Sequence, residues 1–522
     1  MLPEQPKHLD HLFSSNRPPS PQECTSAQNF VQLCDEELTF VESQLANLQQ
    51  QVDQLVSRRS LIQANRRRYL DVLSARRQLP PEIIASFIQL AVALPYDGDQ
   101  SQQPRQARYR VGSVLPFMLV SKEWYETACG IAHFWTELKL DVTEVSGEST
   151  LQLLETASKR FQRASELPLS LTIALSTSNP FNDKVAQFAH SIAARTAAFD
   201  ISFEANSDPD LDLLAQFFRG PFPGALMWPK LQTLHINMRS QGKHFIDLRL
   251  RNAFSDPQRF PALRSVTIVG PQGIFSALDL PWSGLSTLRL DSFHMSRIGI
   301  GHYLSVLGQC ANLQSLHLSI QGLANESCPA NGLPLITLPR LTHLYFEYTQ
   351  YNERFIATIL TCLQLPSLQS LTSVNDGHHT TIVRNLIHLF HRWGCQESLK
   401  YLEINLGAAL GNSANDLRSM FRETPRLFGL KMSGQRLHAG CLSGIPESVQ
   451  DLTVGTSFPA VDDARHSFLN FLRVRNRSLL SIDSTPMKAR LDIVDSMDTA
   501  SFCESLQALK AEFGSTLDVV MS

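Results

Sequence analysis

The chain of 522 residues is too long to fold around one ordinary hydrophobic core, so several domains or one extended repeat array are expected. Its formal net charge of −3 is close to neutral for this length, which excludes a strong overall attraction to nucleic acid or to an acidic membrane surface. Nine cysteines are scattered singly and never form a Cys-x-x-Cys pair. We therefore expect reduced thiols rather than a disulfide framework or a zinc knuckle.

No apolar run approaches the roughly 18 residues that a membrane span needs, and the first residues of the chain are polar where a signal peptide would be apolar. We therefore expect a soluble protein of the cytoplasm or the nucleus. Residues 1–34 carry several prolines among serines and glutamines. Because that composition buries too little apolar surface to stay ordered, a disordered tail is predicted there.

Residues 35–77 are predicted to form one long, coiled-coil-like helix. Apolar side chains recur there with the alternating three- and four-residue spacing of a coiled-coil seam, at Leu38, Val41, Leu45, Leu48, Val52, Leu55, Ile62, Tyr69 and Leu73. Arg59 and Arg66 occupy seam positions, so the pairing surface is sound for about two heptads and then weakens. Two interpretations stay open, namely a homodimer through residues 38–55, or a single amphipathic helix lying on the protein's own later domains.

The same helix is locally basic, with arginines at positions 58, 59, 66, 67, 68, 76 and 77. A basic run of this kind occurs in nucleic-acid-binding segments and also on ordinary solvated helix faces. No aromatic platform is interleaved with these arginines, so the stacking on which single-strand binding relies is missing. We interpret the run as a solvated face and predict no nucleic-acid partner.

Two apolar blocks lie within residues 78–140. The first opens with Leu79-Pro80-Pro81-Glu82-Ile83, in which proline presets the start of a helix and the glutamate suits its first turn. The second runs from Leu115 to Tyr125 and is followed by Trp135. Residues 95–112 form a polar insertion between the blocks, which a loop tolerates at modest entropic cost.

Together the two blocks resemble an F-box. That family opens with Leu-Pro-x-Glu-Ile/Leu, continues with Val-Cys-Lys/Arg-x-Trp, and ends with a tryptophan before a Leu-x-Leu strand. The chain matches at Leu79, Pro80, Glu82, Ile83, Ile88, Val120, Lys122, Trp124 and Trp135, with Ser121 in the cysteine position. Taken singly, the apolar residues also suit the ordinary core of a small helical cap, which is the alternative interpretation.

A Leu-x-x-Leu-x-Leu phrase then recurs nine times between Leu231 and Val454. Its first residues are Leu231, Leu263, Leu285, Leu313, Leu341, Leu368, Leu399, Leu427 and Val449, at spacings of 22–32 residues. Most of these spacings fall in the range of leucine-rich repeats. In every phrase except the one at Leu368, the last two apolar positions flank one residue, commonly polar, as in Leu316-His317-Leu318, which predicts a half-buried strand. Proline often precedes the phrase, where it ends one element before the next begins.

Helical spacing appears between several phrases, at residues 303–307, 355–363 and 382–390. We therefore expect a strand and a helix in each unit of a solenoid over residues 221–515. Leu169–Ile173 and Phe199–Phe203 alternate in the same way without the full phrase. We interpret residues 141–220 as degenerate leading repeats.

The outward positions of the predicted strands carry polar side chains that would line a binding face. They are Gln232, Thr233, His235, Gln314, His317, Tyr345, Glu347, Glu403 and Lys431. Plain solvation accounts for such residues equally well, and the pattern does not say which of them contact a partner.

Motifs of enzyme chemistry are missing from the sequence. It contains no Gly-x-Ser-x-Gly, no phosphate-binding Gly-x-x-x-x-Gly-Lys-Ser/Thr and no His-Glu-x-x-His. The nearest metal candidate is the group His378, His379, His388 and His391, with Asp376 close by. We interpret these residues as a polar loop and a helix flank, and predict a protein that is not an enzyme and has no cofactor, metal or catalytic residue.

The order of long helix, split F-box-like motif and irregular leucine-rich repeats is similar to that of a large group of basidiomycete fungal F-box proteins. The resemblance implies an α/β chain with a long N-terminal helix and a small helical F-box-like bundle, followed by a leucine-rich-repeat solenoid. It further implies that Leu79, Pro80, Glu82, Ile83, Ile88, Val120 and Trp124 bind a Skp-type adaptor of a cullin-RING ubiquitin ligase, while the repeats hold an unknown protein substrate. A repeat scaffold that dimerises through its N-terminal helix and has no ligase role is the alternative.

Overall fold

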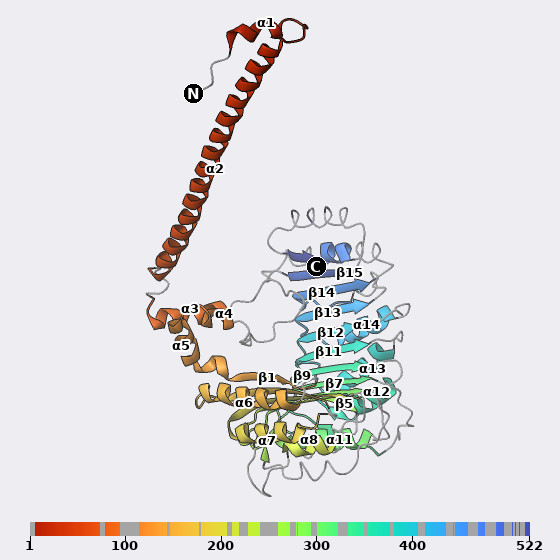
Figure 1. Cartoon of the computed structure of the whole chain (residues 1–522). Coiled ribbons are helices and arrows are strands. Elements are labelled where there is room, and N and C mark those ends of the chain that lie inside the picture. The colour runs from red at the N-terminus through yellow and green to blue at the C-terminus, as the bar shows by residue number, and fades with distance from the viewer. Residues whose placement is uncertain are drawn as a thin grey trace. The chain divides into compact units, whose positions relative to one another are not determined.

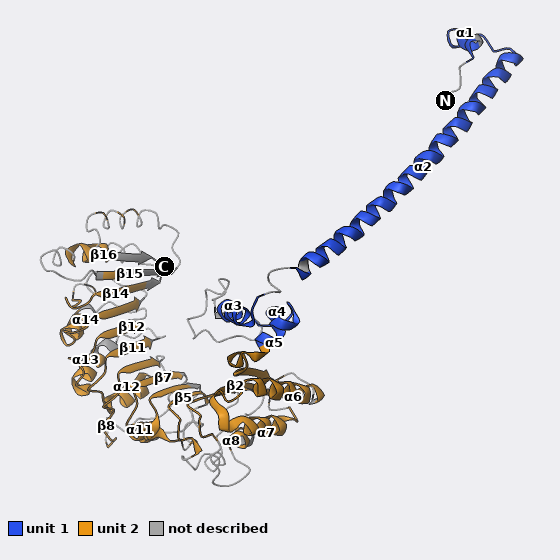
Figure 2. Ribbon diagram, turned by 90° about the vertical axis from the view of Figure 1, so that its left-hand side faces the viewer, with its two compact units in different colours: residues 1–128 blue, residues 129–522 orange. Residues whose placement is uncertain are grey.

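The computed structural model describes most of the chain (Figure 1). The described residues are 6–73, 79–93, 114–143, 147–176, 179–205, 211–218, 228–240, 259–271, 278, 280–293, 300–321, 332–348, 353–375, 381–405, 413–434, 442, 444–457, 468–475, 487–494, 504, 507, 511 and 517–521. The chain divides into two compact units, Met1–Ala128 and Cys129–Ser522, which Figure 2 distinguishes by colour.

The regular elements described in the first unit are all helices. Its elements are η1 (Lys7–Leu9), α1 (Asp10–Phe13), α2 (Pro21–Val72), α3 (Pro81–Ala93) and α4 (Leu115–Met118), and α5 (Lys122–Gly130) crosses the boundary between the units. The predicted polar insertion at 95–112 lies outside the described residues.

The long helix α2 begins at Pro21, fourteen residues before the predicted start at residue 35, so residues 21–34 are helical rather than part of a disordered tail. A capping box explains the earlier start. The backbone N of Ser20 donates to Glu23 Oε2 at 2.7 Å, and the backbone N of Glu23 approaches Ser20 Oγ at 3.4 Å. Pro21 at the first helical position fits the same signal. The Ser-Pro-Gln-Glu motif of this capping box is present in the sequence, but the proline-rich composition around it led to the prediction of a disordered tail.

The second unit contains one large sheet and a series of helices. Its strands are β1 (Glu137–Asp141), β2 (Leu169–Ser176), β3 (Thr196–Ala205), β4 (Thr233–Ser240), β5 (Ser265–Pro271), β6 (Thr287–Phe293), β7 (Ser315–Gln321), β9 (His343–Tyr348), β11 (Ser370–Asn375), β12 (Tyr401–Asn405), β13 (Gly429–Gly434), β14 (Asp451–Ser457), β15 (Met487–Val494) and β16 (Leu517–Met521). A separate pair is formed by β8 (Ile336–Thr337) and β10 (Leu363–Gln364).

Several helices and short 3₁₀ turns connect the strands. They are η4 (Ala132–Trp135), α6 (Gly147–Arg163), α7 (Asn182–Ile192), η5 (Ala193–Arg195), α8 (Leu211–Phe218), η8 (Trp282–Gly284), α11 (Ile300–Gln309), α12 (Glu353–Thr361), α13 (Thr381–Trp393) and α14 (Ser413–Arg422). The helical segments predicted from spacing at 303–307 and 382–390 are confirmed as parts of α11 and α13. The segment predicted at 355–363 is confirmed as far as Thr361, where α12 ends, and Leu363 begins β10 instead.

All fourteen strands of the large sheet run parallel, and each pairs with the next in chain order. The helices lie along one face of this sheet (Figures 1 and 2), and α6 contacts α7, α7 contacts α8, and α11 to α14 follow in contact one after another. Alternate residues of the strands point under the helices and form the core, as Leu234, Leu288 and Leu316 do with 0–1% of their surface exposed. The opposite face of the sheet carries the polar positions.

The predicted fold class is wrong in its second part. The long helix α2 and the short helices α3 to α5 are followed by an α/β unit with one continuous parallel sheet, rather than by a leucine-rich-repeat solenoid. The sheet also takes in β1, β2, β3, β15 and β16, which lack the leucine phrase. Among the described residues the connections are unlike one another, since the part of the β5–β6 connection that is described contains the short turn η8, whereas the β9–β11 connection contains α12 and β10. The phrase specifies half-buried strands, but it does not specify a uniform strand-plus-helix unit.

The boundary after Ala128 places Trp135 in the sheet unit instead of in the predicted segment 78–140. The Trp135 indole Nε1 donates to the carbonyl of Cys129 at 3.1 Å, and the Arg163 guanidinium lies 5.0 Å from its ring centroid. Both contacts lie within the second unit. The tryptophan that closes the F-box-like motif in the sequence therefore anchors the first strand of the sheet.

Candidate protein-binding surfaces

The helices α3 and α5 each begin at residues that favour a helix N-terminus. Pro81 takes the first position of α3 and Glu82 lies in its first turn, where a negative charge suits the helix dipole. Ser121 caps α5, because its Oγ accepts a hydrogen bond from the backbone N of Trp124 at 3.3 Å. Ser121 is the position at which the chain departs from the F-box pattern, and the serine there has a structural use.

Three aromatic rings join α3, α4 and α5. Phe87 meets Trp124 edge to face with ring centroids 5.7 Å apart, and meets Phe117 in the same way at 6.0 Å. Phe117 and Trp124 lie stacked at 6.2 Å. Ile84 and Ile88 of α3 are fully buried beside them. The three helices are therefore held by a small apolar core of their own.

The structure divides the seven predicted adaptor positions into two groups. Ile88 and Trp124 are buried, with 0% and 6% of their surface exposed, and belong to this core. Pro80, Glu82, Ile83 and Val120 are exposed, and Leu79 is half-buried. Only the second group has side-chain surface that a partner can contact directly.

Further apolar side chains lie exposed beside these positions. We define the helical apolar surface as Ile83, Phe87, Leu90, Leu115, Leu119 and Val120, with exposed fractions of 52%, 52%, 63%, 54%, 86% and 40%. Ile83, Phe87 and Leu90 share one face of α3 by their helical spacing, and the Phe87–Phe117 contact joins that helix to α4. The predicted adaptor positions did not include Phe87, Leu90, Leu115 or Leu119, although the offset of 83, 87 and 90 from the buried pair 84 and 88 is a signal that the sequence contains.

The polar face of the sheet carries one continuous row of side chains in register. We call it the strand-face row, and it runs through His235, Thr267, Arg289, His317, Tyr345, Thr372, Glu403, Lys431 and Thr453. Of the nine outward residues predicted from the sequence, His235, His317, Tyr345, Glu403 and Lys431 belong to this row, and Thr233 and Glu347 lie on the same strands. Gln232 and Gln314 stand just before their strands.

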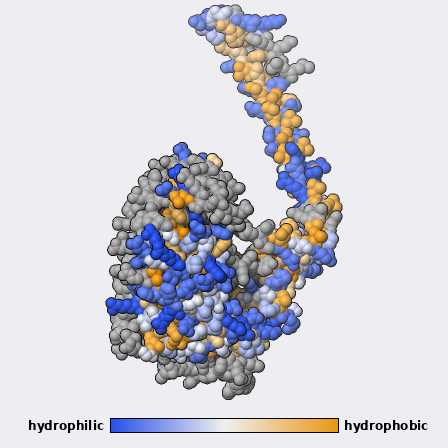
Figure 3. Space-filling model, turned by 180° about the vertical axis from the view of Figure 1, so that it is seen from behind, coloured by the Kyte–Doolittle hydropathy of each residue, from blue (hydrophilic) through white to orange (hydrophobic). Residues whose placement is uncertain are grey.

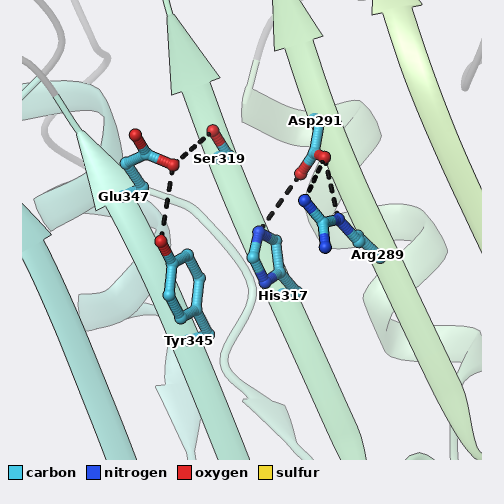
Figure 4. A network of polar contacts seen from close by, with 6 residues as sticks. All are labelled: Arg289, Asp291, His317, Ser319, Tyr345 and Glu347. Carbon is cyan, nitrogen blue, oxygen red and sulfur yellow. Dashed lines mark hydrogen bonds and ion pairs between the residues drawn. The ribbon is translucent and has the colours of Figure 1, made fainter. Parts of the chain in front are cut away.

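Six residues in the middle of this face form a polar network (Figure 4). The Arg289 guanidinium reaches Asp291 Oδ2 at 2.7 and 2.8 Å, and His317 Nε2 lies 3.2 Å from Asp291 Oδ1. The His317 approach lacks the alignment of a full hydrogen bond, so we treat it as an electrostatic contact.

The other half of the network centres on Glu347. Its Oε2 accepts hydrogen bonds from Ser319 Oγ at 3.0 Å and from the Tyr345 hydroxyl at 3.5 Å. The His317 and Tyr345 rings lie face to face, with centroids 3.8 Å apart and planes 6° from parallel, and thereby link the two halves. This part of the sheet is therefore fixed before any partner arrives.

Burial and charge perturb two groups of the network. Burial alone would raise the pKa of Asp291, but the contacts from His317 and Arg289 outweigh it and hold this pKa below its ordinary value. Burial, followed by the nearby Glu347 charge, raises the pKa of Tyr345 to about 12. At neutral pH the network therefore contains an ionised aspartate and a neutral tyrosine.

A shallow pocket lies farther along the same face, between β11 and β14. Tyr401 covers Gly429 so closely that a Cβ there would come within 2.5 Å of the ring atom Cδ1. Phe428 meets the same ring edge to face at 5.8 Å. Lys431 Nζ pairs with Glu403 Oε1 at 2.6 Å beside the pocket, whose lining includes Asp451. The pocket offers an exposed aromatic ring next to charges of both signs, which suits a polypeptide segment.

The histidine group of the sequence does not assemble in the described residues. His391 Nε2 pairs with Glu423 Oε2 at 3.1 Å, and its Nδ1 lies 3.1 Å from Gln396 Nε2. His378, His379 and Asp376 lie outside the described residues. Within the residues that the structure describes, no three His, Cys, Asp or Glu side chains are placed to share a metal ion.

Comparison with known proteins finds no protein-family model that matches the chain, and no significant match among curated proteins. In the part of the chain that the structure describes, none of the helices combines the length and the apolar character that a membrane span needs. Function is therefore inferred from the geometry of the two surfaces and from the motif.

Proposed function

We propose that the protein is a substrate-recognition subunit of a cullin-RING ubiquitin ligase of the Skp–cullin–F-box type, acting in the cytoplasm or the nucleus. In this proposal the helical apolar surface binds a Skp-type adaptor, and the strand face of the sheet holds a protein substrate. The subunit itself performs no chemistry. It positions the substrate, and the ligase assembly supplies the catalytic step.

One observation carries the proposal. Six apolar side chains stay exposed on α3, α4 and the turn that follows, although the rings of Phe87, Phe117 and Trp124 already form a core directly beneath. A concentration of exposed apolar surface on a small folded element is typical of a protein-binding site. It coincides with the segment whose sequence resembles an F-box, which makes a Skp-type adaptor the best-supported partner.

The strand face supports the second half of the proposal. The stacked Tyr345 ring and the exposed Tyr401 ring stand among ion pairs, as in Arg289–Asp291 and Glu403–Lys431. Aromatic and arginine side chains that are already held in place lose little entropy on binding and dominate many interface energies. A folded or extended protein segment with mixed charge fits this face better than a nucleic acid, because the face is not uniformly basic.

Co-purification with a Skp-type adaptor tests the proposal. The intact chain is expected to retain the adaptor, and the double substitution Ile83→Asp with Leu119→Asp is expected to lose it, because two charges would be buried at the contact. Leu151→Asp on α6, at a leucine of the sheet unit that is 45% exposed, is the matched control and keeps the adaptor. Failure of the intact chain to bind any Skp-type adaptor sinks the proposal.

The second candidate function is an interaction scaffold with no ligase role. The strand-face network favours it, since that face is suited to hold a partner whether or not an adaptor binds elsewhere. The two candidates are separated by the same experiment. A chain that retains a protein partner through Tyr345 and Tyr401 but never binds an adaptor is a scaffold.

A further inference from the structure

An apolar seam runs along the whole of α2. Because the helix begins at Pro21, the three-four spacing extends two heptads further toward the N-terminus than the first predicted seam residue, Leu38. We define the α2 seam as Cys24, Ala27, Val31, Cys34, Leu38, Val41, Leu45, Leu48, Val52, Leu55, Arg59, Ile62, Arg66 and Tyr69. Its large apolar side chains keep between 46% (Val41) and 72% (Tyr69) of their surface exposed. Figure 3 shows hydrophobic residues along this helix.

A helix of 52 residues with such a seam is not stabilised by its own composition alone, since most helical stability in proteins comes from packing of an apolar face. A partner packed on the seam would supply this stabilisation. The heptad spacing suits another helix with the same period. The seam positions are placed symmetrically about the middle of α2, so a second α2 helix meets this requirement.

A parallel pair of α2 helices would be electrostatically unfavourable. In that arrangement each seam residue faces its own copy, so that Arg59 would meet Arg59 and Arg66 would meet Arg66. The flanking residue Glu37 would meet Glu42 of the other chain, because flanking positions five residues apart face each other across a parallel pair. Like charges at these places destabilise the pair and select against this orientation.

An antiparallel pair resolves each of these conflicts. We propose that α2 binds α2 of a second copy of this chain, antiparallel and overlapping over the full Pro21–Val72 span. With that overlap every seam residue meets a seam residue, in the layers Cys24–Tyr69, Ala27–Arg66, Val31–Ile62, Cys34–Arg59, Leu38–Leu55, Val41–Val52 and Leu45–Leu48. Each layer occurs twice about the two-fold axis.

The two arginines that break the seam find suitable partners in this register. Arg59 faces Cys34 and Arg66 faces Ala27, and these are two of the three smallest residues of the seam. A small opposite residue leaves room for the long arginine side chain to lie along the seam with its guanidinium at the edge. Asp35 and Glu37 flank Cys34 and bring negative charge to the guanidinium of the facing Arg59.

The charge distribution along α2 favours the same orientation. The first half of the helix, residues 21–46, contains five acidic residues and no basic one, whereas residues 47–72 contain five arginines and two aspartates. Antiparallel pairing sets the acidic half against the basic half. At the flanking positions Glu37 meets Arg58 of the second copy on both sides of the two-fold axis. This inference goes beyond the proposed function and holds whether or not the protein is a ligase subunit.

The native cysteines of the seam report the orientation. Sedimentation of the intact protein is expected to give twice the 58.4 kDa of one chain. On mild oxidation the Arg59→Cys variant is expected to form a cross-link between Cys34 of one chain and the introduced thiol of the other. The unsubstituted protein is expected to form no Cys34–Cys34 cross-link. A parallel pair would instead cross-link Cys34 to Cys34 in the unsubstituted protein, and would not join Cys34 to the thiol introduced at position 59. A chain that stays monomeric at all concentrations, because α2 packs on its own chain or takes a different partner, also overturns the inference.

One charge reversal distinguishes the antiparallel from the parallel orientation without a cross-linking reaction. Glu37→Lys places two lysines opposite Arg58 in the antiparallel pair and is expected to weaken dimerisation on the order of tenfold. In a parallel pair the same change removes the Glu37–Glu42 repulsion and strengthens dimerisation. Glu36→Lys, which faces away from the seam, is the matched control and leaves the dissociation constant unchanged. Adding Arg58→Glu to Glu37→Lys restores the original affinity, and failure of that rescue contradicts the proposed register.

Discussion

Phe87 on α3 meets Trp124 on α5 edge to face, with ring centroids 5.7 Å apart. Phe87 is half exposed whereas Trp124 is buried, so the pair joins the helical apolar surface to the core beneath it. The position of that surface therefore depends on the tryptophan. The F-box-like motif mixes buried residues that hold the surface in place with residues whose side chains are exposed on it, and the two kinds should respond differently to substitution.

Replacing Trp124 by alanine should loosen the three helices. The change removes both ring contacts to Phe87 and Phe117 and should cost about 3–5 kcal/mol of local stability. Ile83→Ala, at a side chain that is 52% exposed, should cost less than about 1 kcal/mol. Hydrogen exchange of the α3 amides measures the difference. Equal protection of α3 in both variants would show that the aromatic cluster does not hold the helix.

The charge of Asp291 should stabilise the sheet at neutral pH and lose its effect in acid. Since its pKa in the folded protein lies below the ordinary value, the stabilisation is present above about pH 4 and disappears as the pH falls through the folded pKa. Asp291→Asn should therefore lower the free energy of unfolding by about 1.5–3 kcal/mol at pH 7. The difference in unfolding free energy between the variant and the unsubstituted protein should shrink below about pH 4, and urea unfolding at several pH values would measure it. A gap that stays constant down to about pH 2 would mean that the Arg289 and His317 contacts are unimportant.

Gly429→Ala should move Tyr401 without unfolding the sheet. The new Cβ would stand 2.5 Å from the Tyr401 ring, and the ring can turn away because it is 47% exposed. The melting temperature should change little, while the Tyr401 ring signals in an NMR spectrum should shift. Gly301→Ala in α11, where nothing lies within 4 Å of the added carbon, is the control that leaves those signals in place. Unchanged Tyr401 signals in the Gly429 variant would contradict the close packing of the pair.

Cys310 and Cys395 should resist alkylation in the folded protein. Burial raises the pKa of each thiol to about 12, so almost no thiolate exists at about pH 8 and the reagent has no access. Mass spectrometry after iodoacetamide treatment should find both residues modified only when denaturant is present. Rapid modification under native conditions would mean that local opening of the fold readily exposes these thiols.

Much of the sheet could be predicted from local patterns. The leucine phrase placed β4 to β7, β9 and β11 to β14, because alternation of Leu316, His317 and Leu318 reports a strand with one buried face. The weaker alternation at residues 169–173 and 199–203 correctly indicated β2 and β3. The continuity of the sheet could not be predicted, because β15 and β16 carry no phrase, and pairing between strands depends on their neighbours rather than on their own residues.

The candidate binding surfaces could be predicted only in part from the sequence. The motif identified the segment that forms the helical apolar surface, but could not separate the buried Ile88 from the exposed Ile83, since both are isoleucines at helical spacing. The contacts of His317 with Asp291 and Tyr345 join three strands that are separate in sequence. Such contacts follow from the register of the sheet, which no single segment contains.

Calorimetric titration of the intact protein with a purified Skp-type adaptor tests the central claim most directly. We predict saturable binding with one adaptor per chain, loss of that binding in the Ile83→Asp, Leu119→Asp double variant, and full binding by the Leu151→Asp control. No heat of binding with the unsubstituted protein, or equal binding by the double variant, would contradict the assignment of the helical apolar surface.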